Sequence, residues 1–295
     1  MTIAHGANTI SRSNGAVDEL YIAHVISATV LDASYSARVM WPLMRNESLA
    51  GEPSNAKKFP RWPALTAASV AETADLTQTA LDTTSVTATV GEIGIQVAIT
   101  DVLSEDDILA GVTEYGRQAG MAIADKMDAD AAALLAGFSN VTGAATPANL
   151  SEANLLEAMS ELDSRDAPDG NLVGVFHPRQ LAQLNTSIIT SGGNVWAGQA
   201  EKFGGRSRGY RGNYLGIDLY STTNVPTGSR AATATFEGAV FVAGEALLAL
   251  TKRAVRTELD RDASSRITEI NITSRYAVAE LVDAWGQTVF TDQTF

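Results

Sequence analysis

The longest helical pattern in this 295-residue chain runs from Thr100 to Phe138 and limits what the remainder can fold into. Apolar side chains recur there every three or four residues, between Ile108 and Leu135, which predicts one helix of about eight turns. At about 1.5 Å per residue this helix would be about 50 Å long, well beyond the usual three or four turns. A helix of this length either lies under a large sheet or braces a plate-like subunit as a spine.

Both ends of the predicted helix carry recognisable signals. Ser104 can cap the first turn, where the acidic residues 105–107 interact favourably with the helix dipole. Gly137 is expected to end the helix in the left-handed conformation. The apolar positions do not keep a heptad, which argues against a coiled coil. Charged residues such as Glu114 and Arg117 exclude a membrane span.

The composition of the chain excludes several kinds of chemistry. There is no cysteine, which excludes disulfides, thiolate metal ligands and a cysteine nucleophile. The three histidines, His5, His24 and His177, are scattered, so we expect no metal site and no cofactor. The formal net charge of −13 repels phosphate backbones and leaves only non-specific contact with nucleic acid. No membrane span or signal-peptide pattern is found, so a cytoplasmic origin is expected.

An extended arm is predicted around residues 41–65, because four prolines there prevent a helix and favour extended backbone. Trp41, Phe59 and Trp62 place large apolar groups on this arm. A chain segment this extended cannot cover such side chains by itself. We therefore treat these three residues as candidates for the interface with another subunit.

A two-stranded ribbon is predicted from about Phe59 to Ile99. Apolar residues alternate before Gly91 and change phase after it, which indicates strands with a bulge at that glycine. An isolated ribbon is marginally stable in water. The ribbon must therefore lie on its own body or on a neighbouring subunit.

Beyond the long helix, short helices and strands follow one another, which predicts a compact mixed α/β unit. Ser151 is the expected cap of a helix over residues 151–163. The other expected elements are a strand at 172–176, a helix after Pro178, strands at 217–221 and 239–243, a helix at 244–250, and strands at 253–260, 267–279 and in the C-terminal tail.

Residues 190–216 are rich in glycine and are predicted to form a long surface loop, a kind of segment that is often functional. The only dense basic patch of the chain lies there, at Arg206, Arg208 and Arg211. These arginines could contact phosphate, pair with carboxylates on a neighbouring copy, or form a solvated turn without a partner. The acidic character of the chain favours the contact with a neighbouring copy.

Two patterns with possible chemistry are weak. Residues 205–209 match the G-x-S-x-G nucleophile motif, but loop flanks it on both sides and no histidine follows Ser207 to act as its base. Asp125, Asp128 and Asp130 lie close together along the long helix but lack the remainder of a calcium loop. They are expected on a solvated helix face.

The order of these segments resembles the major capsid proteins of tailed bacteriophages. The stretches that carry the resemblance are FPRWPALTAASVAETADLT, VTATVGEIGIQVAITD, EYGRQAGMAIADKMDADAAALLAGF, LVGVFHPRQLAQL, YRGNYLGIDLYSTTNVP and FVAGEALLAL. The fold that it implies is α+β, with a long spine helix on a β-sheet peripheral domain, an axial mixed α/β domain, an extended β-hairpin loop and an N-terminal arm. The implied parts are residues 1–45 (N-terminal arm), 46–99 (extended loop), 100–138 (peripheral domain with the spine helix), 139–244 (axial domain) and 245–295 (C-terminal part of the peripheral domain).

The resemblance also implies a function. The chain would be a structural subunit, not an enzyme, that self-assembles into the icosahedral head shell of a tailed phage and encloses its double-stranded DNA. Its partners would be many copies of itself in capsomers, scaffolding, portal and decoration proteins, and non-specifically contacted DNA, with no membrane. It would be found in the virion, and in the host cytoplasm during assembly. The alternatives are an encapsulin-like compartment shell and, more remotely, a serine hydrolase using Ser207.

Overall fold

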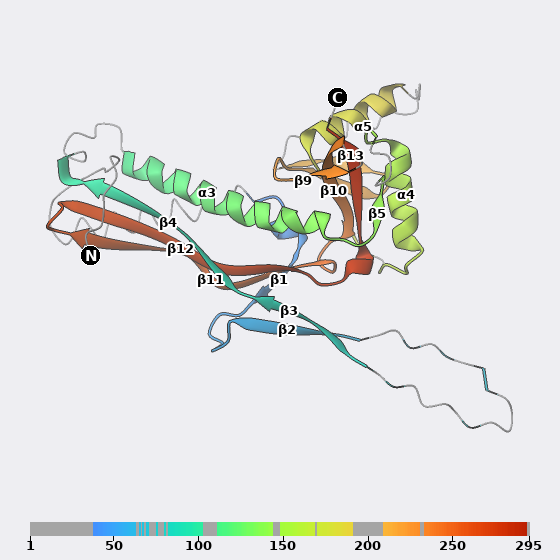
Figure 1. Ribbon diagram of the computed structural model, residues 1–295, viewed down its shortest axis with the longest axis horizontal. Coiled ribbons are helices and arrows are strands. Elements are labelled where there is room, and N and C mark those ends of the chain that lie inside the picture. Colours follow the sequence, from blue (N-terminus) through green and yellow to red (C-terminus); the bar gives the residue numbers. More distant parts are fainter. Residues whose placement is uncertain are drawn as a thin grey trace.

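The computed structural model describes residues 38–62, 65, 67, 69–70, 75, 80, 82–102, 111–143, 148–168, 170–190, 209–230 and 233–293. Its architecture is α+β, as expected. A four-stranded sheet lies along the long helix α3, a seven-stranded sheet lies beyond the C-terminal end of that helix, and a two-stranded ribbon projects away from both (Figure 1). None of the described helices combines the length and the apolar character that crossing a membrane requires.

The four-stranded sheet has the order β1-β11-β12-β4. Its strands are β1 (Arg45–Ser48), β11 (Leu247–Asp262), β12 (Ile267–Glu280) and β4 (Gly91–Thr100). β1 pairs with β11 in parallel, whereas the β11–β12 and β12–β4 pairs are antiparallel. Segments from three distant parts of the sequence therefore build this sheet.

Helix α3 (Gly111–Ala133) packs along one face of this sheet and continues into the short 3-10 helix η2 (Leu134–Ala136). Ile123 and Met127 of the helix are buried against Ile270 and Ile272 of β12. Each such side chain contributes about 1.5–3 kcal/mol when fully buried. Packing on the sheet, more than intrinsic helix propensity, therefore stabilises the spine.

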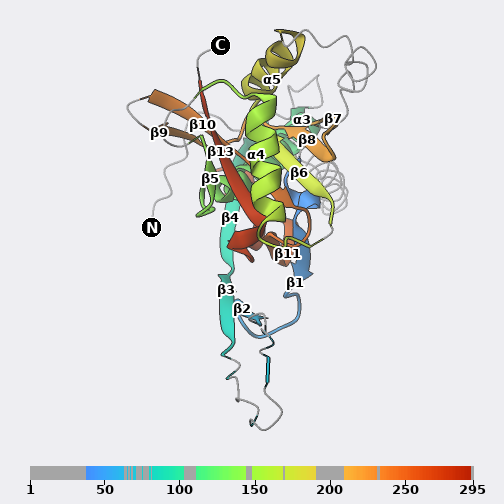
Figure 2. The ribbon, with the colours of Figure 1, turned by 90° about the vertical axis from the view of Figure 1, so that its right-hand side faces the viewer.

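The seven-stranded sheet contains the order β5-β13-β10-β6-β8-β7, and β9 pairs with β10. Its strands are β5 (Val141–Thr142), β13 (Gly286–Asp292), β10 (Thr233–Val242), β6 (Leu172–Phe176), β8 (Ile217–Ser221), β7 (Tyr210–Tyr214) and β9 (Thr227–Arg230). Helices α4 (Glu152–Asp163) and α5 (Pro178–Thr190) pack together on one face of this sheet (Figure 2). The other face packs against the end of α3 and the chain at residues 40–44.

The ribbon consists of β2 (Ala56–Arg61) and β3 (Thr84–Thr89), which pair in antiparallel register with Arg61 opposite Thr84. The predicted ribbon is confirmed up to this point, but its extension to Ile99 is wrong. Gly91 does not form a bulge; it begins β4, which pairs with β12 in the body. The alternating isoleucines that follow Gly91 require the buried face under α3, which a free ribbon cannot provide.

The predicted helix at residues 244–250 is also wrong, because Leu247 begins the long strand β11. The side chains of residues 247–250 are fully buried, and they alternate between two separate core clusters on the two faces of the strand. A short apolar run of this kind fits a strand covered on both sides as well as it fits a helix. The predicted 190–216 loop is likewise partly a strand, since residues 210–214 form β7.

The ends of the long helix and the last strand differ from expectation as well. Gly137 has a φ of −79° and follows a 3-10 turn, so it is not left-handed. Residues 101–102 are already helical, while Ser104 lies outside the described residues. The tail forms a strand as predicted, but β13 joins the seven-stranded sheet and does not lie beside α3. The other predicted strands and the helices after Ser151 and at Pro178 are confirmed.

Candidate subunit contact surface

The base of the ribbon is attached firmly to its own subunit. Phe59 packs against a buried cluster that includes Leu49 and Leu248. Lys57 Nζ lies 3.3 Å from Glu47 Oε2 and 5.6 Å from the centre of the Phe59 ring. Lys252 Nζ donates to the carbonyl oxygen of Glu52 at 3.3 Å. These contacts fix the direction in which the ribbon leaves the body.

Beyond β2 the arm carries apolar side chains that its own chain leaves uncovered. Trp62, Leu65 and Val70 are 64%, 66% and 47% exposed. Water-exposed groups of this size on a projecting segment are typical of a surface that another protein covers. The position of Trp62 therefore agrees with the prediction of an interface residue, and its contact with another subunit stays a prediction.

Trp41 lies in a different environment from the one expected for an arm residue. Its ring packs edge-on against Tyr276 of β12, with 5.7 Å between ring centres. The guanidinium of Arg38 lies 5.4 Å from the Trp41 ring. Trp41 is therefore partly buried within its own subunit, as the first residue of the 3-10 helix η1 (Trp41–Leu43). Phe59 is likewise packed on its own body, so of the three aromatic candidates Trp62 is the one left exposed.

Arg206 and Arg208 lie outside the described residues, whereas Arg211 is partly buried on strand β7. The predicted patch of three arginines therefore stays a prediction. A nucleophile elbow needs a helix after the serine. Here strand β7 begins at Tyr210, and Gly209 adopts a φ of +79° just before it. The described residues that follow Ser207 thus lack this feature of a hydrolase site.

Asp128 contradicts the expectation of a solvated helix face, because it is only 2% exposed. Its Oδ1 accepts hydrogen bonds from the backbone N–H groups of Val39 at 2.9 Å and Met40 at 2.7 Å. Its Oδ2 accepts one from the Thr222 hydroxyl at 3.3 Å. Burial raises the pKa of Asp128 in spite of these hydrogen bonds, which act to lower it. This carboxyl fixes where the described N-terminal segment meets α3 and the seven-stranded sheet.

The helical spacing of apolar residues around Asp128 indicates in the sequence that this carboxyl is buried. Ala124 and Ala131 lie four residues before and three residues after Asp128, so all three share one stripe of the helix. Both alanines are fully buried. An acidic residue on an apolar stripe needs hydrogen-bond donors from elsewhere in the fold, which the sequence does not identify.

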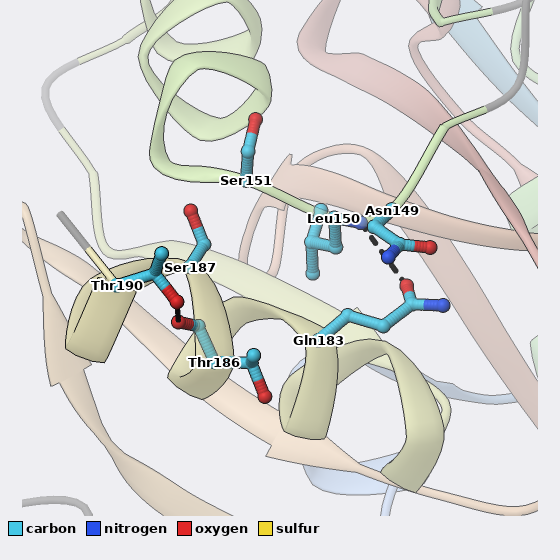
Figure 3. Close-up of a pocket in the computed structure, with 7 residues that line it drawn as sticks. All are labelled: Asn149, Leu150, Ser151, Gln183, Thr186, Ser187 and Thr190. Atoms are coloured by element: carbon cyan, nitrogen blue, oxygen red, sulfur yellow. Dashed lines mark hydrogen bonds between the residues drawn. The ribbon is translucent and has the colours of Figure 1, made fainter. Parts of the chain in front are cut away.

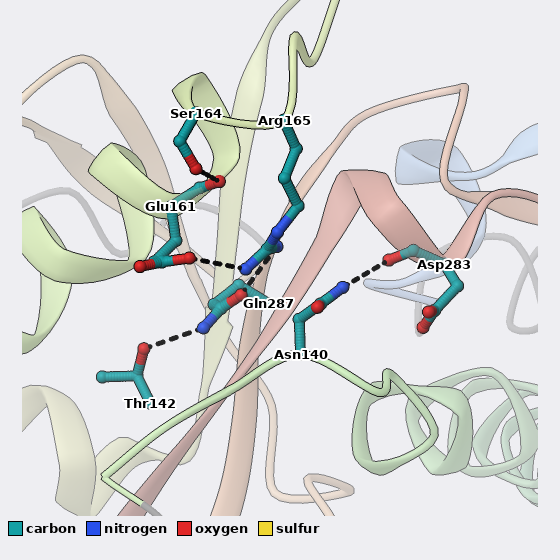
Figure 4. A network of polar contacts seen from close by, with 7 residues as sticks. All are labelled: Asn140, Thr142, Glu161, Ser164, Arg165, Asp283 and Gln287. Carbon is teal, nitrogen blue, oxygen red and sulfur yellow. Dashed lines mark hydrogen bonds and ion pairs between the residues drawn. The ribbon is translucent and has the colours of Figure 1, made fainter. Parts of the chain in front are cut away.

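A polar network holds the segments that cross between the two sheets (Figure 4). Asp283, in the 3-10 helix η5 (Asp283–Trp285), accepts from the Ser139 N–H at 2.7 Å and, through its carbonyl, from Asn140 Nδ2 at 3.3 Å. Gln287 donates to the Thr142 hydroxyl at 3.0 Å. The links between α3 and β5 and between β12 and β13 are therefore joined to each other.

A second part of this network reaches α4. Arg165 donates to Gln287 Oε1 at 2.9 Å and to Glu161 Oε2 at the same distance. The guanidinium thus connects the end of α4 to the start of β13. Sequence reasoning missed this arrangement, because its members come from segments more than a hundred residues apart.

Glu280 adds a titratable group to this junction. Burial and the adjacent Asp283 carboxyl raise the pKa of Glu280 to about 7, while the guanidinium of Arg61 at the end of β2 opposes the rise. Ionisation of Glu280 near neutral pH therefore changes the charge where the ribbon, β12 and the seven-stranded sheet meet.

A pocket of about 420 Å³ lies between the start of α4 and the face of α5 (Figure 3). Gln183 spans one side of it, accepting from the Leu150 N–H at 3.0 Å and donating to the carbonyl of Asp292 at 3.0 Å. The other described lining groups are the Leu150 side chain, amides and hydroxyls, including Ser151, which caps α4 with Asn154. Among the described residues that line the pocket there is no carboxylate, histidine or lysine, and hence no acid–base pair.

The described histidine has a structural role. His177 precedes α5, where its Nδ1 accepts from the Arg179 N–H at 3.2 Å, and its ring stacks on Phe236 with 4.1 Å between ring centres. Burial lowers the pKa of His177. His5 and His24 lie outside the described residues. Within the described part of the chain, no group of three or more His, Cys, Asp or Glu residues is arranged to hold a metal ion.

Comparison with known proteins connects this architecture to a family. The sequence profile of the family described as "Phage capsid protein" matches residues 63–286. No curated protein matches the chain.

Solved structures with this fold include phage capsids and a related particle. The capsid of the cyanophage P-SCSP1u superposes with a TM-score of 0.67 at 15% identity, covering 88% of this chain and 89% of that one. The structure from Mycobacterium phage Che8 gives a TM-score of 0.65 at 18% identity, covering 85% and 90%. A virus-like particle from Pyrococcus furiosus gives 0.59 at 9% identity, covering 90% and 98%. The fold is thus the tailed-phage major capsid protein fold that the order of the segments implied, and the chain belongs to the phage capsid protein family, as a structural subunit of the phage head shell.

Proposed function

We propose that many copies of this chain form the closed icosahedral head of a tailed phage around double-stranded DNA, with the arm of each subunit lying over an adjacent one. The observation that carries the proposal is the exposed apolar arm beyond β2, with Trp62 and Leu65 uncovered. Closed symmetric assembly repeats each weak contact many times, so such a small surface on each subunit is sufficient to hold the shell together.

The parts of the subunit follow the two sheets. In this proposal residues 1–45 form the N-terminal arm and residues 46–99 include the extended loop, although β1 and β4 belong to the four-stranded sheet. The four-stranded sheet and α3 form the peripheral domain. Residues 139–244 form the axial domain together with β13, and its loops meet around the symmetry axes of the capsomer.

The arm can be tested by removing it without disturbing the body. Arg61 and Thr84 are directly opposite in the ribbon, so an Asn-Gly pair in place of residues 62–83 would close β2 and β3 with a two-residue turn. We expect a folded subunit that forms no particles in electron micrographs. Ile189→Ser, which removes an apolar side chain that is 80% exposed on α5, is the control and should assemble normally. Complete shells from the shortened chain would refute the role of the arm.

The remaining partners follow from the shell function. Scaffolding, portal and decoration proteins would bind the assembled subunits, and the packaged DNA would be contacted non-specifically, because the chain has a net charge of −13. The subunit would assemble in the host cytoplasm and remain in the virion. We also propose that it catalyses no reaction. Labelling of Ser207 by a fluorophosphonate probe would contradict this.

An encapsulin-like compartment is the second candidate, supported by the similarity to the Pyrococcus furiosus virus-like particle. Both candidates predict a closed shell and differ in its contents. Nuclease-protected double-stranded DNA in particles purified from an infected host would support the phage head. A protein cargo without DNA would support the compartment.

A further inference from the structure

The carboxyl group of Glu280 lies where the end of β12, the end of the long helix and the ribbon meet. Glu280 is the last residue of β12, and the next two N–H groups, those of Leu281 and Val282, donate to the carbonyl oxygen of Ala246 at 2.8 Å and 3.2 Å. Glu280 Oε2 lies against Gly137, 3.4 Å from where a Cβ atom on that glycine would be. The backbone around the carboxyl is thus held in place, and its side chain is the part that can change partner.

Asp283 is the acidic neighbour of Glu280. The two carboxyls are hydrogen-bonded to each other, and a carboxyl pair can share a hydrogen bond only while one member holds a proton. Asp283 is fixed, because its Oδ1 also accepts from the Ser139 N–H at 2.7 Å. Glu280, whose pKa is raised to about 7, therefore carries the shared proton.

The ribbon brings a positive charge to the same place. Phe59 of β2 packs in one apolar cluster with Leu281, and Arg61 follows Phe59 by two residues, on the same side of the strand. The Arg61 guanidinium is exposed and attracts Glu280 through space, without a hydrogen bond to it. Arg61 is also the last residue of β2, where the paired part of the ribbon ends.

Among the described residues, Asp283 and Arg61 are the charged groups that act on Glu280. Gly137, at the end of the long helix, and Leu247, the partner of Glu280 on β11, carry no charge. When Glu280 loses its proton, two carboxylates repel each other at hydrogen-bonding distance while the attraction to Arg61 increases. Ionisation therefore weakens one contact of Glu280 and strengthens the other.

We propose that Glu280 is a pH-dependent switch that connects the ribbon to the body of the subunit. With its proton, Glu280 bonds to Asp283 and leaves Arg61 free. Without it, the proton having passed to water, Glu280 turns away from Asp283 and forms an ion pair with Arg61. The ribbon beyond Phe59 is then held to the end of β12 in the ionised state and released in the protonated state. The inference concerns a single subunit, so it goes beyond the shell function and does not depend on it.

A spin label can follow the ribbon, because the chain contains no cysteine of its own. Thr84 is exposed and pairs directly with Arg61, so Thr84→Cys carrying a nitroxide reports on the end of the paired ribbon. Electron paramagnetic resonance spectra of the unassembled full-length subunit give the mobility of the label. We expect greater mobility at about pH 5 than at about pH 9, with the midpoint at about pH 7.

Substitutions in the labelled chain identify the groups responsible. Glu280→Gln and Arg61→Gln should each abolish the pH response and leave the label at its low-pH mobility, whereas Arg61→Lys keeps the charge and should retain the response. Asp283→Asn should lower the midpoint by about one pH unit, because an amide can donate to the ionised Glu280. Lys58→Gln is the matched control, since Lys58 is also an exposed cation of β2 but lies on the opposite side of the strand; it should respond as the parent does.

Equal mobility of the label at both pH values in the parent would overturn the proposal. A response that persists in Glu280→Gln or in Arg61→Gln would overturn it as well, because the switch needs both groups. Lower mobility at the lower pH would show that protonation holds the ribbon, which contradicts the proposed direction. None of these results depends on particle formation, so they are distinct from a failure of the shell function.

Discussion

Replacing Asp128 by alanine tests whether one buried carboxyl holds the N-terminal segment to the body. The change removes the acceptor for the N–H groups of Met40 at 2.7 Å and Val39 at 2.9 Å. A buried donor without a partner costs about 1–3 kcal/mol. Met40 is fully buried and the Val39 contact is part-buried, so we expect the free energy of unfolding to fall by about 3 kcal/mol. For a chain of this length that is a decrease in Tm of about 5 °C.

Asp128→Asn is the matched control. An amide oxygen can still accept from both backbone groups, and the amide nitrogen can donate to the Thr222 hydroxyl. The neutral side chain also avoids the cost of burying a carboxylate, the same effect that raises the pKa of Asp128. We therefore expect this variant to lie within about 1 kcal/mol of the parent.

Urea unfolding, followed by tryptophan fluorescence, should be measured on the shortened-arm chain. Assembly would otherwise couple stability to protein concentration. If Asp128→Ala loses less than about 1 kcal/mol, or if Asp128→Asn loses as much as Asp128→Ala, hydrogen bonds to this carboxyl do not anchor the segment.

Three further perturbations test other parts of the structure. The pKa of Glu280 is raised from 4.5 to about 7, so between these pH values the native state binds a proton that the unfolded state has lost, and the free energy of unfolding should fall as pH rises. Glu280→Gln should flatten this pH profile. At pH 8 the variant should be more stable than the parent by about 1 kcal/mol in urea unfolding, after allowance for solvent screening. Gly286→Ala would place a Cβ in steric overlap with the Phe138 ring and should cost about 1–3 kcal/mol in the same assay, and an unchanged stability would show that the ring moves freely. Changing Arg206, Arg208 and Arg211 together to Glu should impair particle formation without lowering the subunit Tm, and normal particles would remove that loop from the contacts between copies.

Local patterns in the sequence determined the elements whose character depends on their own residues. The long helix, the capped helix after Ser151 and the buried strand at residues 172–176 each follow from periodicity and end signals within one stretch. The prolines of the arm and its exposed residue Trp62 likewise predicted a surface that another subunit covers. The order of these stretches was sufficient to recognise the family.

The tertiary structure alone decided which segments pair with which. The change of partner at Gly91, from β2 to β12, depends on a face under α3 that is completed more than a hundred residues later in the chain. The strand at Leu247 and the burial of Asp128 depend in the same way on distant groups. A strand is defined by hydrogen bonds to another segment, and a buried carboxyl by donors that surround it, so neither can be read from spacing within one stretch.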